Sequence, residues 1–152
     1  MDNSLPVVGR GFCYEDLRVG QKFRTHRRTI AESDLANFIN LTWLTEELFA
    51  VADDSGRALK GRPVPGALVY AFAEGLLLPT MQDTGLAFLN ATLDIKAPTS
   101  VGDTIHVECE VTEARLTSKG DRGLVRTFNK VVNQHGATVI EYNPLRMLRR
   151  KS

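Results

Sequence analysis

The feature that most constrains the fold is an apolar stretch at residues 67–78 with proline and glycine at its ends. Pro65 and Gly66 precede it and Pro79 follows it, which predicts a helix that starts and stops at these residues. Its only charged residue is Glu74, so we expect a helix that is buried on nearly every side. Such a helix would be about 20 Å long. A small domain built around this helix is therefore the first prediction.

The rest of the chain after this helix has the pattern of β-strands. In residues 104–116, Ile105, Val107, Cys109 and Val111 alternate with polar residues, so one face of this strand is expected in the core and the other in water. Gly-, Pro- and Asn-containing turn signals separate the extended runs. We predict four strands, at 86–97, 104–116, 123–133 and 137–149.

Before the central helix, the sequence predicts one strand and two short helices. Residues 21–28 have the character of a strand. Thr29 and Glu32 have the spacing of a capping box, and the apolar residues that follow favour a helix through Thr42. A second short helix is expected over 45–52.

This order of elements predicts an α+β fold in which an antiparallel sheet wraps around one long central helix. We expect a single domain over residues 1–152, with flexible ends at 1–12 and 150–152.

Composition excludes several classes of protein. Hydrophobic residues make up 43% and charged residues 24% of the chain, which is unlike an intrinsically disordered protein. The formal net charge of +1 provides no strong field for nucleic acid or an anionic membrane, so we expect neither as a partner. The basic residues within 146–151 are interpreted as a solvated end.

The two cysteines, Cys13 and Cys109, do not form a C-x-x-C motif, which argues against a zinc or redox site. His26, His106 and His135 are expected at the surface, and no spacing predicts a metal site. We find no secretory signal pattern and no apolar run of about 20 residues that would cross a membrane. The cytoplasm is the expected location.

Five short motifs, in their order along the chain, resemble the MaoC-like dehydratase family, and the similarity extends over residues 14–149. The motifs are 14–23 (YEDLRVGQKF), 28–34 (RTIAESD), 37–42 (NFINLT), 61–66 (GRPVPG) and 96–98 (KAP) with 101–103 (VGD). The resemblance implies a hot-dog fold and a homodimer or higher oligomer, with sheets paired edge to edge. It also implies an acyl thioester substrate, carried on coenzyme A or acyl carrier protein, and no cofactor.

In this family, a backbone N–H at the start of the central helix polarises the thioester carbonyl, and the matching residue here is Gly66, after Pro65. The physical basis does not depend on the family, because a helix N-terminus presents free N–H groups and a partial positive charge. Glycine also lets a substrate approach closely. The alternative is that Gly66 only makes a turn.

The acid–base pair of the family does not carry over to this chain. Leu44 stands where the resemblance would place the histidine, and related dehydratases have their pair at the positions of Ala58 and Ala71. The segment that replaces the usual pair contains polar residues that could position a water, and an aromatic residue that could line an acyl pocket or simply pack. These candidates are Asn40, Thr42, Trp43 and Glu46.

Glu74 suggests a different activity. Some hot-dog thioesterases resemble this chain in having a catalytic carboxylate eight residues after the glycine, the separation of Gly66 and Glu74. This separation is about 12 Å along one helix, so a partner chain would have to supply the second group. Alternatively, Glu74 faces solvent or a basic neighbour such as Arg126. Lys96 and Arg126 are also candidates to contact a coenzyme A phosphate.

Three hypotheses follow. The first is an enoyl-thioester hydratase or dehydratase that uses Gly66 and the polar segment. The second is an acyl-CoA thioesterase that uses Glu74, and the third is a non-catalytic acyl-binding subunit.

Overall fold

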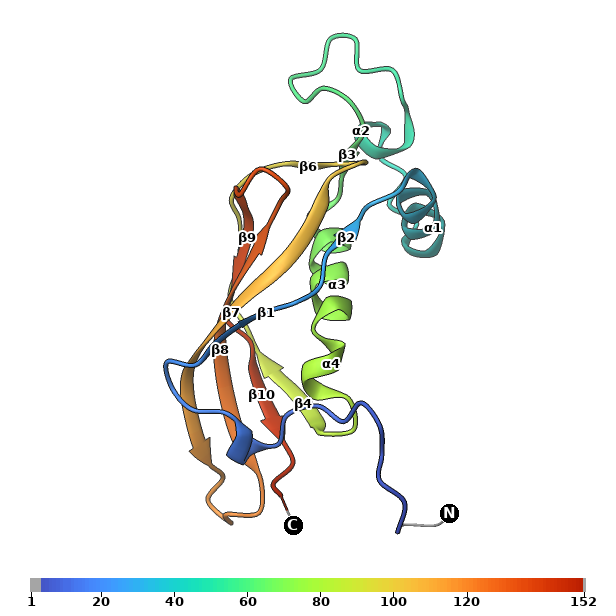
Figure 1. Ribbon diagram of the computed structural model, residues 1–152. Coiled ribbons are helices and arrows are strands. Elements are labelled where there is room, and N and C mark those ends of the chain that lie inside the picture. The colour runs from blue at the N-terminus through green and yellow to red at the C-terminus, as the bar shows by residue number, and fades with distance from the viewer. Residues whose placement is uncertain (1–3, 152) are drawn as a thin grey trace.

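The computed structural model describes residues 4–151. It is an α+β fold in which a curved antiparallel sheet lies along one side of the central helix (Figure 1), as the sequence predicts. The helical elements are η1 (Tyr14–Asp16), α1 (Glu32–Thr42), α2 (Glu47–Ala50), α3 (Gly66–Leu76) and α4 (Leu78–Met81). The strands are β1 (Lys22–Arg24), β2 (Arg28–Thr29), β3 (Pro63–Val64), β4 (Gly85–Asn90), β5 (Leu93–Ile95), β6 (Thr99–Ser100), β7 (Thr104–Leu116), β8 (Gly123–Val132), β9 (Thr138–Tyr142) and β10 (Leu145–Leu148).

The main sheet has the order β1-β7-β8-β10-β4, and β9 joins β8 to β5. β7 has the predicted bounds and β8 differs by one residue, but the other two expected strands are each interrupted. Asn143 and Pro144 separate β9 from β10, because proline has no N–H to donate to the ladder. The side chain of Asn143 accepts the N–H of Thr92 at 2.7 Å. This bond holds the matching break between β4 and β5.

The central helix α3 is buried on one side and exposed on the other, which corrects the expectation of burial on nearly every side. Leu68, Val69 and Ala73 are buried in the core, whereas Ala67 and Ala71 are exposed. The small side chains on the outer face count as apolar residues although they are exposed. Apolar character alone therefore overestimated the burial.

The bounds of several predicted elements were also wrong. Pro79 does not stop the helix but lies in the first turn of α4, where its missing N–H costs no bond. Thr29 lies in β2, where its hydroxyl contacts that of Thr104 at 2.6 Å. Asp34 caps α1 instead by accepting the N–H of Ala31 at 2.8 Å. The expected first strand is divided into β1 and β2, and α2 is shorter than the expected 45–52.

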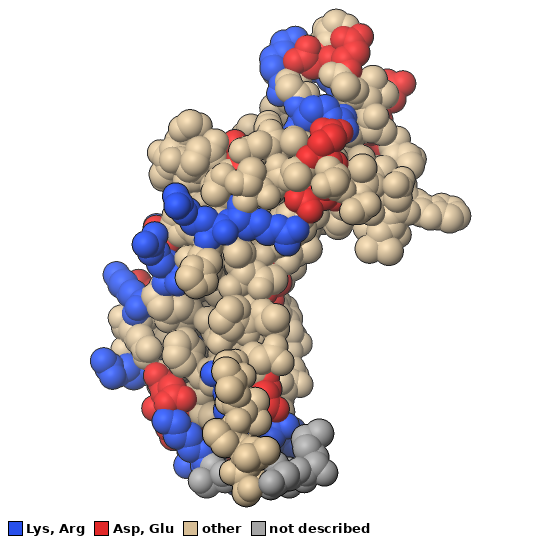
Figure 2. Space-filling view, turned by 45° about the vertical axis from the view of Figure 1, so that its right-hand side comes forward, with Lys and Arg blue, Asp and Glu red and all other residues tan. Residues whose placement is uncertain are grey.

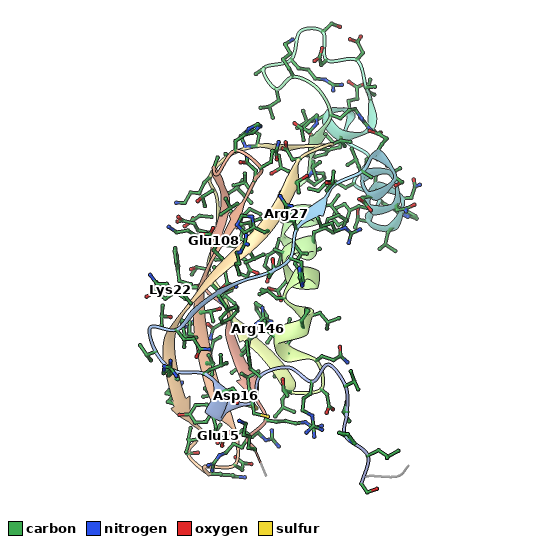
Figure 3. All side chains as sticks on the ribbon, in the orientation of Figure 1. Glu15, Asp16, Lys22, Arg27, Glu108 and Arg146 are labelled. Carbon is green, nitrogen blue, oxygen red and sulfur yellow. The ribbon has the colours of Figure 1, made fainter. Side chains whose placement is uncertain are left out.

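Residues at both ends of the described chain make specific contacts. The N–H of Gly11 donates to Gln82 at 2.8 Å. Arg150 pairs with Glu15 at 2.8 Å and Lys151 pairs with Asp16, and Figure 3 shows both acidic residues near the C-terminal end. Hydrogen bonds from the Lys151 backbone and the Arg150 side chain lower the pKa of Glu15 to about 2.

On the face drawn in Figure 2, basic side chains predominate across the middle and along one edge, and acidic side chains lie mainly near the top and the bottom. Within residues 4–151, none of the helices has both the length and the apolar character needed to cross a membrane.

Candidate active site

The start of α3 is set by the short strand before it. Pro63 and Val64 are buried and pair with Ser100 and Thr99 of β6. Pro65 then has extended backbone angles, φ −56° and ψ 137°, and its carbonyl accepts the first helical bond, from Leu68 at 3.0 Å. The N–H groups that precede this bond have no partner inside a helix, which leaves the N–H of Gly66 available to a ligand.

The glycine at position 66 is explained by space and not by backbone angle. Gly66 is absent from the glycines with positive φ in the described chain, so a turn does not require it. A Cβ at this position would lie 2.8 Å from the Cδ1 of Ile95 on β5. Ile95 is 53% exposed, so it forms a partly open wall beside the helix start. A side chain at residue 66 would therefore have to displace the end of the Ile95 side chain.

Glu74 lies on the side of α3 that faces the sheet, where its carboxylate has hydrogen-bond partners. Its carboxylate accepts two bonds from Arg146 of β10, at 2.6 and 2.7 Å, and one from the hydroxyl of Tyr142 at 2.9 Å. Figure 3 shows Arg146 in the space between the sheet and the central helix. The expected partner, Arg126, instead donates to Asn90 and to the carbonyl of Asn143. Arg126 was the wrong choice because strand register, not sequence distance, decides which arginine faces the helix.

The residues around this ion pair are weakly hydrated. Tyr142 is 1% exposed, and the rings of Tyr70 and Tyr142 meet edge to face at 5.1 Å. Burial raises the pKa of both phenols, and burial raises the pKa of the Cys109 thiol to about 12. All three groups are therefore neutral at physiological pH.

These shifts predict alkaline instability. In the unfolded chain the Cys109 thiol ionises near its ordinary pKa of 9.0, but in the folded protein near about 12. The stability that this pKa difference contributes is present below pH 9 and is lost as the pH rises toward 12, by about 1.4 kcal/mol per pH unit for one proton. We expect the melting temperature to fall between pH 9 and 11, and to fall less in Cys109→Ala. An unchanged melting temperature across this range would contradict the assignment.

The polar segment after α1 lies at the surface. Asn40 and Thr42 are exposed, and the hydroxyl of Thr42 donates to the carbonyl of Phe38 at 2.7 Å. Trp43 is 85% exposed with φ 60°, so its ring does not pack into the core of its own chain. Glu46 is the exposed residue before α2. Within residues 4–151, no hydrogen bond joins this segment to Gly66 or Glu74.

The remaining candidates have local partners. Lys96 lies 3.8 Å from Asp94 and 3.6 Å from Glu141. His106 lies 3.1 Å from Glu108, with its side chain 14% exposed, while His26 and His135 are exposed as expected. The described chain contains no cluster of three His, Cys, Asp or Glu side chains suited to a metal ion.

Sequence reasoning missed Asn129. This residue is fully buried on β8, opposite Cys109 of β7 and Tyr142 of β9. The sequence does contain a signal, because Asn129 is two residues from Thr127 and Val131 and shares the inward face of its strand with them and with Val125. A buried polar residue in such a row should have been singled out.

No protein-family model matches the sequence. The chain is 30% identical over 100 residues to an (R)-specific enoyl-CoA hydratase of Rhodospirillum rubrum. The aligned region covers 65% of this chain and 69% of that protein. The chain belongs to the family of MaoC-like dehydratases and (R)-specific enoyl-CoA hydratases.

Solved structures agree with this assignment. The (R)-hydratase PhaJ1 of Pseudomonas aeruginosa is 28% identical with a TM-score of 0.78, over 93% of this chain and 88% of that one. A Mycobacterium tuberculosis protein with a double hotdog fold is 21% identical with a TM-score of 0.83, over 96% of this chain and 46% of that one. The second likeness concerns the fold alone, and the fold is a hot-dog fold.

Proposed function

We propose that this chain binds enoyl thioesters and catalyses the addition or removal of water, with the N–H of Gly66 polarising the thioester carbonyl. The observation that carries the proposal is the start of α3, where the N–H of Gly66 has no partner within the helix and no side chain of its own shields it. The family relationship adds the substrate class, because its curated relative is named an enoyl-CoA hydratase. Coenzyme A or acyl carrier protein would be the carrier.

The chemistry fits this position. When the oxygen of water bonds to the β-carbon, electrons move through the double bond to the thioester carbonyl, and a proton then joins the α-carbon. Negative charge therefore develops on the carbonyl oxygen. A hydrogen-bond donor fixed at a helix N-terminus stabilises that charge before the proton arrives.

The proton transfers need another group. Leu44, Ala58 and Ala71 cannot exchange protons, so we propose that the polar segment handles the water. Glu46 supplies the carboxylate that accepts its proton, and Asn40 and Thr42 hydrogen-bond the water. This role requires the segment to reach a thioester at Gly66, either in the same chain or across an interface.

A homodimer would bring such a segment to a site. β4 and β5 form one edge of the sheet, and their apolar side chains are exposed, which is costly for an edge strand left open. Leu86, Phe88, Leu89, Leu93 and Ile95 are between 39% and 53% exposed. We propose that a second copy covers this edge, and that Trp43, 85% exposed, lines the acyl site of the assembled dimer.

The contacts of Glu74 weigh against the thioesterase hypothesis. The oxygens of this carboxylate already accept bonds from Arg146 and Tyr142, so they are held in place and are not free to attack a thioester or a water. Lys96 and Arg126 are also partly occupied by local partners, which weakens their case as contacts for a coenzyme A phosphate. A non-catalytic acyl-binding role remains the alternative if no turnover occurs.

The reverse reaction tests the proposal with defined stereochemistry. We expect the protein to dehydrate (R)-3-hydroxybutanoyl-CoA and to leave the (S) isomer unchanged, measured as absorbance of the conjugated thioester. Glu46→Gln should lower the rate by about a hundredfold, the lower range for an acid–base group. Glu47→Gln is the matched neighbour and should keep wild-type activity. Equal rates in the two variants would remove Glu46 from the mechanism.

A further inference from the structure

Three residues of α3 form a line along one face of the helix. Gly66, Tyr70 and Glu74 are spaced at i, i+4 and i+8, so they lie one above the other. Tyr70 is about 6 Å and Glu74 about 12 Å from Gly66 along the helix axis. We call this line the Gly66 stripe.

Side chains from three strands cover the Gly66 stripe. Ile95 of β5 lies beside Gly66. Tyr142 of β9 meets Tyr70 at 5.1 Å and Glu74 at 2.9 Å, and Arg146 of β10 meets Glu74 at 2.6 Å. Side chains therefore pack against the stripe from its second turn onward.

The direction of a bound acyl group follows from polarity, provided that the proposed function holds. The carrier is large and charged, so it must stay in water, whereas the acyl group gains from leaving water. With its carbonyl at the N–H of Gly66, the acyl chain would extend inward along the stripe. It would meet the ring of Tyr70 after about one helical turn.

This barrier is held firmly. Tyr142 is 1% exposed, and its hydroxyl is bound to Glu74. Glu74 is bound twice by Arg146, whose guanidinium also lies 5.0 Å from the ring centre of Phe88. Moving Tyr142 would break its bond to a carboxylate that Arg146 holds in place, which is costlier than rotating a free apolar side chain. Tyr70 is held by its edge-to-face contact with Tyr142.

We propose that Tyr70 and Tyr142, fixed by the Glu74–Arg146 pair, restrict this protein to short acyl thioesters. This proposal rests on the proposed function. It makes Tyr70 and Tyr142 specificity-determining residues, and it gives Glu74 and Arg146 a positioning role in place of a catalytic one.

The test is calorimetric titration of the wild-type protein with butanoyl-CoA and octanoyl-CoA, which does not depend on turnover. An open apolar track would bind the octanoyl thioester on the order of a hundredfold more tightly, because of its four extra methylene groups. A closed stripe predicts that octanoyl-CoA binds no more tightly than butanoyl-CoA. Tyr70→Ala should tighten octanoyl-CoA binding by at least about tenfold and leave butanoyl-CoA within about threefold.

Two variants control for packing. Tyr70→Phe keeps the ring and should keep the length limit, whereas Phe72→Ala removes an aromatic ring from another face of α3 and should leave both affinities unchanged. Tyr70→Leu replaces Tyr70→Ala if thermal melting shows that the latter does not fold. Octanoyl-CoA binding at least about tenfold tighter than butanoyl-CoA in the wild type, or no gain in the Tyr70 variants, would overturn the length limit alone. A failure to bind either thioester would overturn the proposed function as well.

Discussion

Gly66→Pro is expected to lower the hydration rate by about a hundred- to a thousandfold, the usual loss when one donor to a developing oxyanion is removed. Proline has no N–H, yet it is favoured at the first position of a helix. Pro65 before it already has extended backbone angles, φ −56° and ψ 137°, which a following proline requires. The variant should therefore fold while losing the N–H that polarises the thioester carbonyl.

Gly66→Ala is the matched control for this experiment. It adds the same Cβ, 2.8 Å from the end of the Ile95 side chain, but keeps the N–H. Crowding should affect both variants, whereas loss of the donor affects only the proline variant. If kcat/KM fell equally in the two, the space at residue 66 would matter and its N–H would not.

Arg146→Ala is expected to lower the free energy of unfolding by about 2–3 kcal/mol. The side chains of Arg146 and Glu74 are 15% and 23% exposed, so removal of the guanidinium leaves a poorly solvated carboxylate. We place the cost below the usual range for a fully buried pair because some solvent reaches both groups. Urea unfolding gives the value directly.

Two comparisons distinguish the effect of losing the ion pair from the effect of shortening a side chain. Arg150→Ala breaks an exposed pair with Glu15 and should cost less than about 1 kcal/mol. Replacing both members of the inner pair, as Glu74→Gln with Arg146→Met, should recover part of the loss because no unpaired charge remains. An Arg146→Ala protein as stable as Arg150→Ala would show that the inner pair contributes little.

The sequence was most informative where local chemistry decides the structure. Pro65 and Gly66 predicted the start of α3, since both residue types restrict what a helix can begin with. Alternation along 104–116 predicted β7 with its observed bounds, because one buried face imposes a period of two.

Long-range pairing decided the features that were missed. Whether Arg126 or Arg146 faces Glu74 depends on the register of β10 against β8, which no local pattern contains. The register of β9 against β8 places Tyr142 beside Asn129. The exposed face of α3 also could not be predicted, because alanine and glycine suit both a core and a solvent-facing surface.

The most direct test of the central claim is to incubate the purified protein with but-2-enoyl-CoA and to follow the products by mass spectrometry. Our account predicts that the intact thioester gains the mass of one water, and that Gly66→Pro abolishes most of this gain. Release of free coenzyme A with no hydrated thioester would contradict it and would indicate thioester hydrolysis.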